Sequence, residues 1–289
     1  MTTAMEKHPL RAGVIGWPIG HSLSPIIHRY WLDYFGIEGR YEPVPVAPED
    51  LETSVLHLIR EDGWRGMNVT VPHKEAVVSL CDHVDEMAER LGAVNTLAVG
   101  PDGRIEGRNT DLYGFRRNLE TAADWPNTGR DSAVVLGAGG AARAVVGALR
   151  ELGFQRVDIV NRTKSKAEGL AALFGPGTFA ADFNDLSDLL SGADLLVNTT
   201  ALGMKGQPPL DIDLEPLPVT ALVTDIVYNP LKTGILAAAE ARGNPTVDGL
   251  GMLLHQAVPG FCAWFSPKET PTVTPELRAA VLKAMADTP

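Results

Sequence analysis

At 289 residues, the chain is long enough for two domains of ordinary size, each with its own hydrophobic core. Hydrophobic residues make up 45% of it and charged residues 21%, a balance that excludes disordered and fibrous classes of protein. The net charge of −11 argues against non-specific binding to nucleic acid or anionic membranes, because both need a basic surface.

Apolar runs of strand length alternate with amphipathic segments of helix length, which is the pattern of an α/β fold with mostly parallel sheets. In chain order, strands are expected at residues 11–15, 65–71, 133–136, 157–160, 195–198 and 222–226. Helices are expected at residues 24–35, 51–61, 84–91, 141–152, 165–173 and 235–241. The polar stretch at residues 122–131 predicts a connector, with a domain boundary within residues 114–130. The segment after Asp248 is too short to be a domain by itself and must pack on another one.

The two cysteines, Cys81 and Cys262, form no CxxC pair, so the sequence predicts neither a disulfide framework nor a metal site. The first residues lack the apolar run of a secretory signal, and no later stretch approaches the roughly 20 apolar residues of a membrane span. These features predict a cytoplasmic protein without nucleic-acid or membrane partners. The sequence does not define the oligomeric state, and a homodimer stays open.

The strand expected at residues 133–136 leads into a glycine-rich turn and then an alanine-rich helix. Gly137, Gly139 and Ala142 have the GxGxxA spacing of dinucleotide-binding folds, in which glycine lets the backbone approach a pyrophosphate at the positive end of a helix. The motif alone is weak, since glycine turns also serve packing. The predicted phosphate site comprises Gly137, Ala138, Gly139, Gly140 and Ala141.

The end of the next expected strand distinguishes between the two nicotinamide cofactors. NAD-binding folds usually place an acidic residue there for the ribose 2′-hydroxyl, whereas a 2′-phosphate needs Arg and small hydroxyl donors. This chain has Asn161, Arg162 and Thr163 there, with Lys166 one turn later. The alternative is a solvated basic helix start, but cations at that end oppose the helix dipole. The pattern therefore predicts NADP.

Three polar clusters follow expected strands of the first half, where open α/β sheets bind ligands. Each also has a structural interpretation. Ser24 before a proline makes a good helix start, Thr70 is an ordinary strand residue, and Asn and Asp are common in turns. The clusters comprise residues 22–25, residues 68–74, and residues 95–96 with 109–111.

Together, these motifs resemble the shikimate dehydrogenase family. The resemblance runs from about residue 14 to residue 264, and the motifs occur in the order seen in the family. They are SLSP at 22–25, NVTVPHK at 68–74, GAVNT at 92–96, NTD at 109–111, the glycine turn, NRT at 161–163, DIVYNP at 225–230 and GLGMLLHQ at 249–256.

The resemblance implies a reversible, NADPH-dependent reduction of 3-dehydroshikimate to shikimate, in the shikimate pathway of aromatic amino acid biosynthesis. It implies an N-terminal α/β substrate domain, residues 1–113 completed by residues 249–289. Residues 114–248 would form a Rossmann-like NADP-binding domain, with the active site in the cleft between the two domains.

Each matching residue takes a role from the family. Lys74 and Asp111 would be the catalytic pair. The substrate contacts would come from Ser22, Ser24, Thr70, Asn95, Asp111, Tyr228 and Gln256. Besides the glycine turn and the basic residues, the cofactor would be contacted by Glu86, Ile226 and Gly249.

The chemistry supports these roles. Oxidation of a secondary alcohol releases a proton as hydride passes to the nicotinamide, so an acid/base group must lie within hydrogen-bond reach of the alcohol oxygen. Lys74 suits that position, with Asp111 orienting the ammonium. Neutral Ser, Thr, Asn and Gln side chains suit a polyhydroxylated ring, because a ligand that lacks a hydroxyl leaves buried polar groups unpaired.

Two alternatives remain. A quinate/shikimate dehydrogenase of broader specificity would commonly carry Thr for one serine and an acidic residue where this chain has Arg162. A non-catalytic ligand sensor would be expected to lose the acid/base groups or the glycine turn, all of which are present. The chain departs from the family at Trp264-Phe265-Ser266, where Trp-Thr-Gly is expected, and at Thr200-Ala201, where Thr-Ser is frequent.

Overall fold

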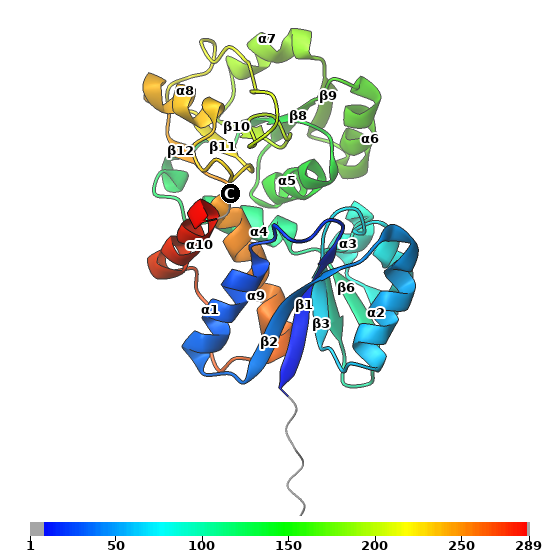
Figure 1. Cartoon of the computed structure of the whole chain (residues 1–289). Helices are drawn as coiled ribbons and strands as arrows, with labels where there is room; N and C mark the ends of the chain where they lie inside the picture. Colours follow the sequence, from blue (N-terminus) through cyan, green and yellow to red (C-terminus); the bar gives the residue numbers. More distant parts are fainter. Residues whose placement is uncertain (1–8, 288–289) are drawn as a thin grey trace, which may run out of the picture. The chain divides into compact units, whose positions relative to one another are not determined.

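The structure is a computed structural model that describes residues 9–287 of the chain. It divides into two compact units, one made of Met1–Thr110 with Ala257–Pro289 and the other of Asp111–Gln256. Each unit has a six-stranded sheet with helices packed on it (Figure 1). The prediction of two α/β domains is confirmed.

The sheet of the first unit is mixed, with the strand order β2-β1-β3-β5-β6-β4. Strand β1 runs parallel to β2 and β3, whereas β5 is antiparallel to both β3 and β6. Helix α1 packs on β1 and β2, and α2 covers the opposite face, where its apolar side chains meet Ile15 and Met67 (Figure 1). The strands are β1 (Leu10–Gly16), β2 (Gly39–Pro45), β3 (Gly66–Val69), β4 (His83–Val84), β5 (Thr96–Val99) and β6 (Ile105–Arg108). The helices are α1 (Ser24–Phe35), α2 (Leu51–Arg60), α3 (Glu86–Leu91), the second half of α9 (Leu250–Phe265) and α10 (Pro275–Asp287).

The sheet of the second unit is parallel throughout, in the order β12-β11-β10-β7-β8-β9, and is Rossmann-like. Its central strands are fully buried runs of Val, Leu and Ala, as expected for a parallel sheet with helices on both faces. The strands are β7 (Ser132–Leu136), β8 (Arg156–Val160), β9 (Thr178–Ala181), β10 (Leu195–Asn198), β11 (Leu222–Asp225) and β12 (Thr246–Val247). The helices are α4 (Asp111–Glu120), α5 (Gly140–Glu151), α6 (Lys164–Phe174), α7 (Leu186–Leu190) and α8 (Gly234–Arg242), with the first half of α9.

The two compact units meet at slightly different positions from the predicted domain boundaries. The units divide after Thr110 and after Gln256, and the predicted domains after residues 113 and 248. Helix α4 belongs to the second unit because its apolar residues Leu112 and Phe115 are buried and the helix packs on α5. The polar stretch at residues 122–131 connects α4 to β7 within that unit.

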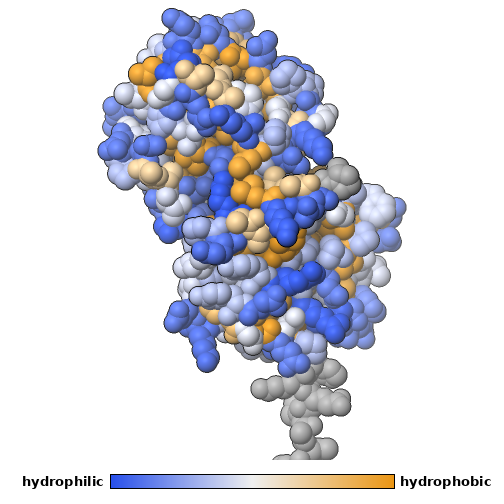
Figure 2. Space-filling model, turned by 60° about the vertical axis from the view of Figure 1, so that its left-hand side comes forward, coloured by the Kyte–Doolittle hydropathy of each residue, from blue (hydrophilic) through white to orange (hydrophobic). Residues whose placement is uncertain are grey.

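The surface in Figure 2 mixes hydrophilic residues with smaller hydrophobic patches. Within residues 9–287, no helix combines the length and the apolar character needed to cross a membrane.

The departure from the family at Ser266 has a structural consequence. Ser266 directly follows α9 and is the only non-glycine residue with positive φ among the residues that the structure describes, at 43°. Its N–H donates to the carbonyl of Cys262, closing the last turn of the helix. The left-handed region costs a residue with a Cβ about 1 kcal/mol, which is why glycine is frequent at this position.

We therefore expect Ser266→Gly to raise the free energy of unfolding by about 0.5–1 kcal/mol, because it relieves this strain. Thermal unfolding monitored by circular dichroism measures the change. The matched control is Ser54→Gly inside α2, which should lower stability by roughly 0.5 kcal/mol, since glycine is a poor helix former there. An equal loss in both variants would contradict the prediction.

Candidate functional site

The loop that follows β3 carries Lys74, and hydrogen bonds hold it to two other segments of the first unit. The His73 ring is 1% exposed, and its Nε2 lies 2.8 Å from the carbonyl oxygen of Val46. The backbone N–H of His73 donates to Thr70, and the carbonyl of Lys74 accepts from the N–H of Val94 at 2.8 Å. These bonds fix the backbone of Thr70 and Lys74 beside the segment that leads into β5.

The second polar cluster meets this loop through Asn95. The side-chain Oδ1 of Asn95 accepts hydrogen bonds from the N–H of Thr110 at 2.8 Å, from Thr110 Oγ1 at 3.2 Å and from Thr96 Oγ1 at 3.0 Å. Because Oδ1 has these donors, any contact of Asn95 with a ligand hydroxyl is made by the amide Nδ2. Asn95 thus holds Thr110, which directly precedes Asp111. Asn95 also directly follows Val94, whose N–H donates to the carbonyl of Lys74.

The start of α1 brings the two serines together. Leu23 occupies the N-cap position without a side-chain bond, and the N–H of Ser24 donates to Ser22 Oγ at 3.3 Å. Ser24 is therefore not the capping residue of α1. Two hydroxyls at the positive end of a 12-residue helix suit the binding of a carboxylate.

Within the second unit, α4 and α9 approach closely at Gly114. A Cβ on Gly114 would lie 2.7 Å from the Cβ of Gln256. Asp111 is three residues before Gly114 and therefore shares its side of α4. The structure thus brings Asp111 and Gln256 to the same helix contact.

The glycine turn has the geometry of a phosphate site. Gly137 has φ of 105°, its N–H donates to the carbonyl of Val160 at 2.8 Å, and a Cβ there would lie 2.7 Å from Thr199 Oγ1. Gly139 precedes α5 and has no side chain to cap the first-turn N–H groups. Among the described residues, none comes within 4 Å of a Cβ built on Gly139 or Gly140. The residues present fit a pyrophosphate at this helix end.

The basic loop lies beside this turn, because Asn161 directly follows Val160. Asn161 Nδ2 donates to the carbonyl of Thr163 at 2.8 Å, which fixes the loop, and the side chains of Arg162, Thr163 and Lys166 are exposed. Two cations and a hydroxyl next to the glycine turn fit a ribose 2′-phosphate.

A buried carboxylate that the sequence reasoning did not single out supports the loop after β11. Asp225 accepts hydrogen bonds from Asn198 Nδ2 at 3.0 Å, the N–H of Val227 at 2.9 Å and Thr233 Oγ1 at 2.7 Å. Burial raises the pKa of Asp225, and these three donors oppose that rise. The only sequence signal was its place at the start of the DIVYNP motif.

This support orders the predicted residues Ile226 and Tyr228. The N–H of Ile226 donates to the carbonyl of Asn198 at 3.1 Å, and Gly249 packs so closely on the carbonyl of Ile226 that a Cβ would overlap it. Ile226 and Gly249 are therefore neighbours, and their contact with the cofactor stays a prediction. Tyr228 is half-buried, and burial raises the pKa of its hydroxyl.

Two features of the first unit lie apart from these clusters. Glu86 is exposed in the first turn of α3, where a carboxylate suits the helix dipole, and its contact with cofactor stays a prediction.

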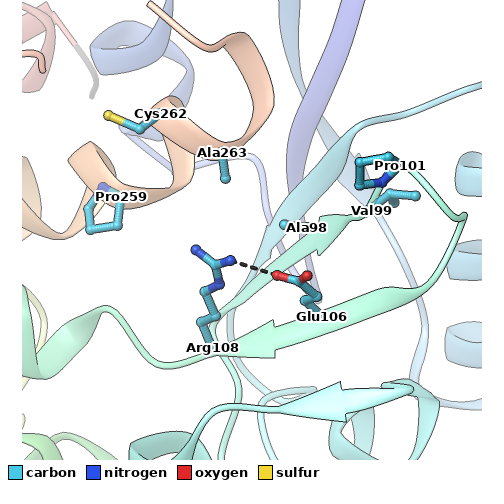
Figure 3. A pocket seen from close by; sticks show the side chains of 9 residues that line it. Ala98, Val99, Pro101, Glu106, Arg108, Pro259, Cys262 and Ala263 are labelled. Atoms are coloured by element: carbon cyan, nitrogen blue, oxygen red, sulfur yellow. Dashed lines mark hydrogen bonds and ion pairs between the residues drawn. The ribbon is translucent and has the colours of Figure 1, made fainter. Parts of the chain in front are cut away.

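A hollow of about 490 Å³ lies between the β5–β6 hairpin and the second half of α9 (Figure 3). It holds an ion pair of Arg108 with Glu106 at 2.6 Å, and its lining contains none of the predicted site residues.

Comparison with known proteins agrees with this geometry. Residues 14–97 match the shikimate dehydrogenase substrate binding domain, and residues 120–204 match the shikimate / quinate 5-dehydrogenase family. A shikimate dehydrogenase (NADP(+)) from Paramagnetospirillum magneticum is 55% identical over 94% of this chain and 97% of its own length. The chain belongs to the shikimate dehydrogenase family. The predicted resemblance is confirmed.

Solved structures of family members are similar along the whole chain. The shikimate 5-dehydrogenase of Thermus thermophilus, in complex with NADP(H) and shikimate, is 36% identical with a TM-score of 0.82, covering 95% of this chain and 99% of its own. The quinate dehydrogenase of Corynebacterium glutamicum, in complex with NAD, is 33% identical with a TM-score of 0.87 at the same coverage. The fold is therefore shared by enzymes of both specificities.

Proposed function

We propose that this chain catalyses the reversible NADPH-dependent reduction of 3-dehydroshikimate to shikimate, a step of aromatic amino acid and chorismate biosynthesis. The observation that carries the proposal is the pair of hydrogen bonds at Val94 and Asn95 in the first unit. The N–H of Val94 donates to the carbonyl of Lys74, and the side chain of Asn95 accepts from the N–H of Thr110, which directly precedes Asp111. The ammonium of Lys74 and the carboxylate of Asp111 are the groups that acid/base chemistry at a ring hydroxyl requires.

In the proposed reaction, Lys74 acts as the general acid. When bound, NADPH supplies hydride to the carbonyl carbon. The ammonium of Lys74 stabilises the negative charge that develops on the carbonyl oxygen and then gives that oxygen its proton. Asp111 orients the ammonium and accepts a hydrogen bond from the adjacent ring hydroxyl. In the reverse direction, neutral Lys74 takes the proton from the hydroxyl.

The other polar residues fix the ring. Ser22 and Ser24 bind the substrate carboxylate at the start of α1, and Thr70, Asn95, Tyr228 and Gln256 contact the ring or its hydroxyls. Four of these residues belong to the first unit, and Tyr228 and Gln256 belong to the second. The second unit holds NADP through the glycine turn and the Asn161 to Lys166 loop, with Ile226, Gly249 and Glu86 as further contacts.

The decisive experiment compares shikimate and quinate, each with NADP and with NAD, by following nicotinamide reduction. We expect kcat/KM to be highest for shikimate with NADP, by about tenfold or more over each other pair. NAD lacks the 2′-phosphate that the basic loop would bind, and the extra tertiary hydroxyl of quinate needs a partner of its own in the pocket. Absence of turnover with shikimate would overturn the proposed function.

The quinate alternative has one observation in its favour, the TM-score of 0.87 to a quinate dehydrogenase. Against it stand the two serines at the start of α1 and the basic loop after β8, where that alternative would place Thr and an acidic side chain. Turnover of quinate with NAD at a rate matching shikimate with NADP would favour it.

A cytoplasmic location is part of the proposal, and it is supported by Cys81 and Cys262, both free thiols. Homodimer formation stays a prediction, which sedimentation of the purified protein tests.

A further inference from the structure

A buried polar network crosses the first sheet beneath the start of α1, with Tyr41 of β2 at one end. Tyr41 is 3% exposed, and its hydroxyl donates to Asn68 Oδ1 on β3 at 2.6 Å. Strand register places Tyr41 opposite Ala12, and Asn68 opposite Val14 and Thr96. Ala12 and Val14 are two residues apart on β1, so their side chains point to the same face of the sheet. Their partners Tyr41, Asn68 and Thr96 therefore lie on that face too, which is the one that α1 covers.

Tyr41 reaches over one strand to make this bond. Strands β2 and β3 both pair with β1 and are therefore about 10 Å apart, two strand spacings. The small side chain of Ala12 leaves room for the Tyr41 ring above β1. The ring stacks on His28 of α1, with centroids 3.9 Å apart and planes 11° apart, so its direction is fixed.

On one side, this network meets the serine at the start of α1. Ser24 is the first residue of α1, and Tyr41 packs on this helix through its stack on His28. Burial raises the pKa of Tyr41 well above its ordinary value, and the Ser24 side chain opposes the rise. The phenol therefore stays protonated at working pH and donates to Asn68. Tyr41 is the direct link between α1 and β3.

On the other side, the network reaches the start of α4. Asn68 Nδ2 donates to Thr96 Oγ1 at 3.1 Å and to the carbonyl of Asn95 at 3.3 Å. Thr96 Oγ1 lies 3.2 Å from Thr110 Oγ1. Hydrogen bonds therefore continue from Tyr41 through Asn68, Thr96 and Asn95 to Thr110, which directly precedes Asp111.

We infer that Tyr41 is a positioning residue that fixes the spacing, within the first unit, between the start of α1 at Ser24, which binds the substrate carboxylate, and Asn95 at the other end of the substrate site. This inference rests on the proposed function. A substrate with a carboxylate at one end of the ring and the reacting hydroxyl at the other must engage both ends at once, and the Tyr41 network holds those ends at one separation. Tyr41 itself is buried, so it acts through these residues.

The test is Tyr41→Phe, which keeps the ring on His28 and removes the hydroxyl. We expect kcat/KM for shikimate to fall about tenfold, with KM for NADP changed by less than about twofold, because misplacement of one end costs transition-state binding. The matched control is Tyr34→Phe on α1, whose side chain is 71% exposed and which should match the wild type.

A double-mutant cycle with Ser24→Ala separates positioning from general loss of structure. If Tyr41 acts through Ser24, kcat/KM of the double variant should lie within about threefold of the value for the poorer single variant. Independent roles would instead multiply the two losses of kcat/KM. Losses that multiply would overturn the inference, as would Tyr41→Phe kinetics equal to those of Tyr34→Phe.

Thr96→Val breaks the network at its other end with little change of shape and keeps the test decisive if Tyr41→Phe proves unstable. We expect a loss of kcat of about tenfold, since the hydroxyl that joins Asn68 to Asn95 is gone. The loss of thermal stability should be small, because Asn68 Nδ2 keeps the carbonyl of Asn95 and Asn95 Oδ1 keeps its two donors from Thr110. Wild-type kcat in Thr96→Val would overturn the inference. Failure of the wild-type protein to oxidise shikimate would instead refute the proposed function, so the two failures are distinguishable.

Discussion

Replacement of Lys74 by Ala is expected to lower kcat by about 10²–10⁴-fold, the usual contribution of a positioned acid/base group. The carbonyl of Lys74 is bonded to Val94 through the backbone, so the substitution leaves the loop geometry intact and removes only the ammonium. The KM for NADP should change little, because the glycine turn and the basic loop are unaltered. Initial rates at saturating shikimate and NADP measure the effect.

Two variants define what Lys74 contributes. Lys74→Arg keeps the charge but stays protonated, so it should remain slow in the oxidative direction, where the group must accept a proton. Lys268→Ala, at an exposed position of the same unit, is the matched control and should retain wild-type rates. Turnover of Lys74→Ala near the wild-type value would remove Lys74 from the mechanism.

The second unit could be predicted closely from the sequence, for a physical reason. Parallel strands buried on both faces are continuous apolar runs, so β7, β8 and β10 stand out against the amphipathic helices between them. The glycine turn and the following helix appear where the GxGxxA spacing placed them, because φ of 105° at Gly137 requires glycine.

Strand β2 could not be predicted in the same way. It contains Pro43 and Pro45, which normally argue against a strand, and they are tolerated because β2 is at the edge of the sheet and pairs only with β1. Helix α4 was hidden for a different reason. Its apolar residues Leu112, Phe115 and Leu119 do follow the helical spacing, but the predicted domain boundary fell within residues 114–130. The packing on α5 assigns the helix to the second unit.

The residues of the candidate site also fall into a predictable group and an unpredictable group. Residues in local motifs, such as Lys74 and Arg162, could be assigned from the family pattern. Residues that act through distant partners could not, because Tyr41 and Asn68 are 27 positions apart and only strand register brings them to one face. Asp225 belongs to the same class, since its role depends on Asn198 and Thr233 from two other segments.

Arg162→Ala is expected to weaken NADP binding by about 10–100-fold and NAD binding by less than about twofold, because a charge-assisted hydrogen bond to the 2′-phosphate is lost and NAD has no such group. The loop itself should persist, since Asn161 holds it through the carbonyl of Thr163. Fluorescence titration of each reduced cofactor gives the two dissociation constants.

Lys164→Ala provides the matched control for Arg162, because it removes an equal charge at an exposed position two residues away that has no assigned contact. A general electrostatic effect would weaken NADP similarly in both variants, whereas a direct bond affects Arg162→Ala far more. Equal losses for NADP and NAD in Arg162→Ala would contradict the assignment of the basic loop to the 2′-phosphate. The selectivity for NADP would then have to come from Thr163 or Lys166, the other donors beside the glycine turn.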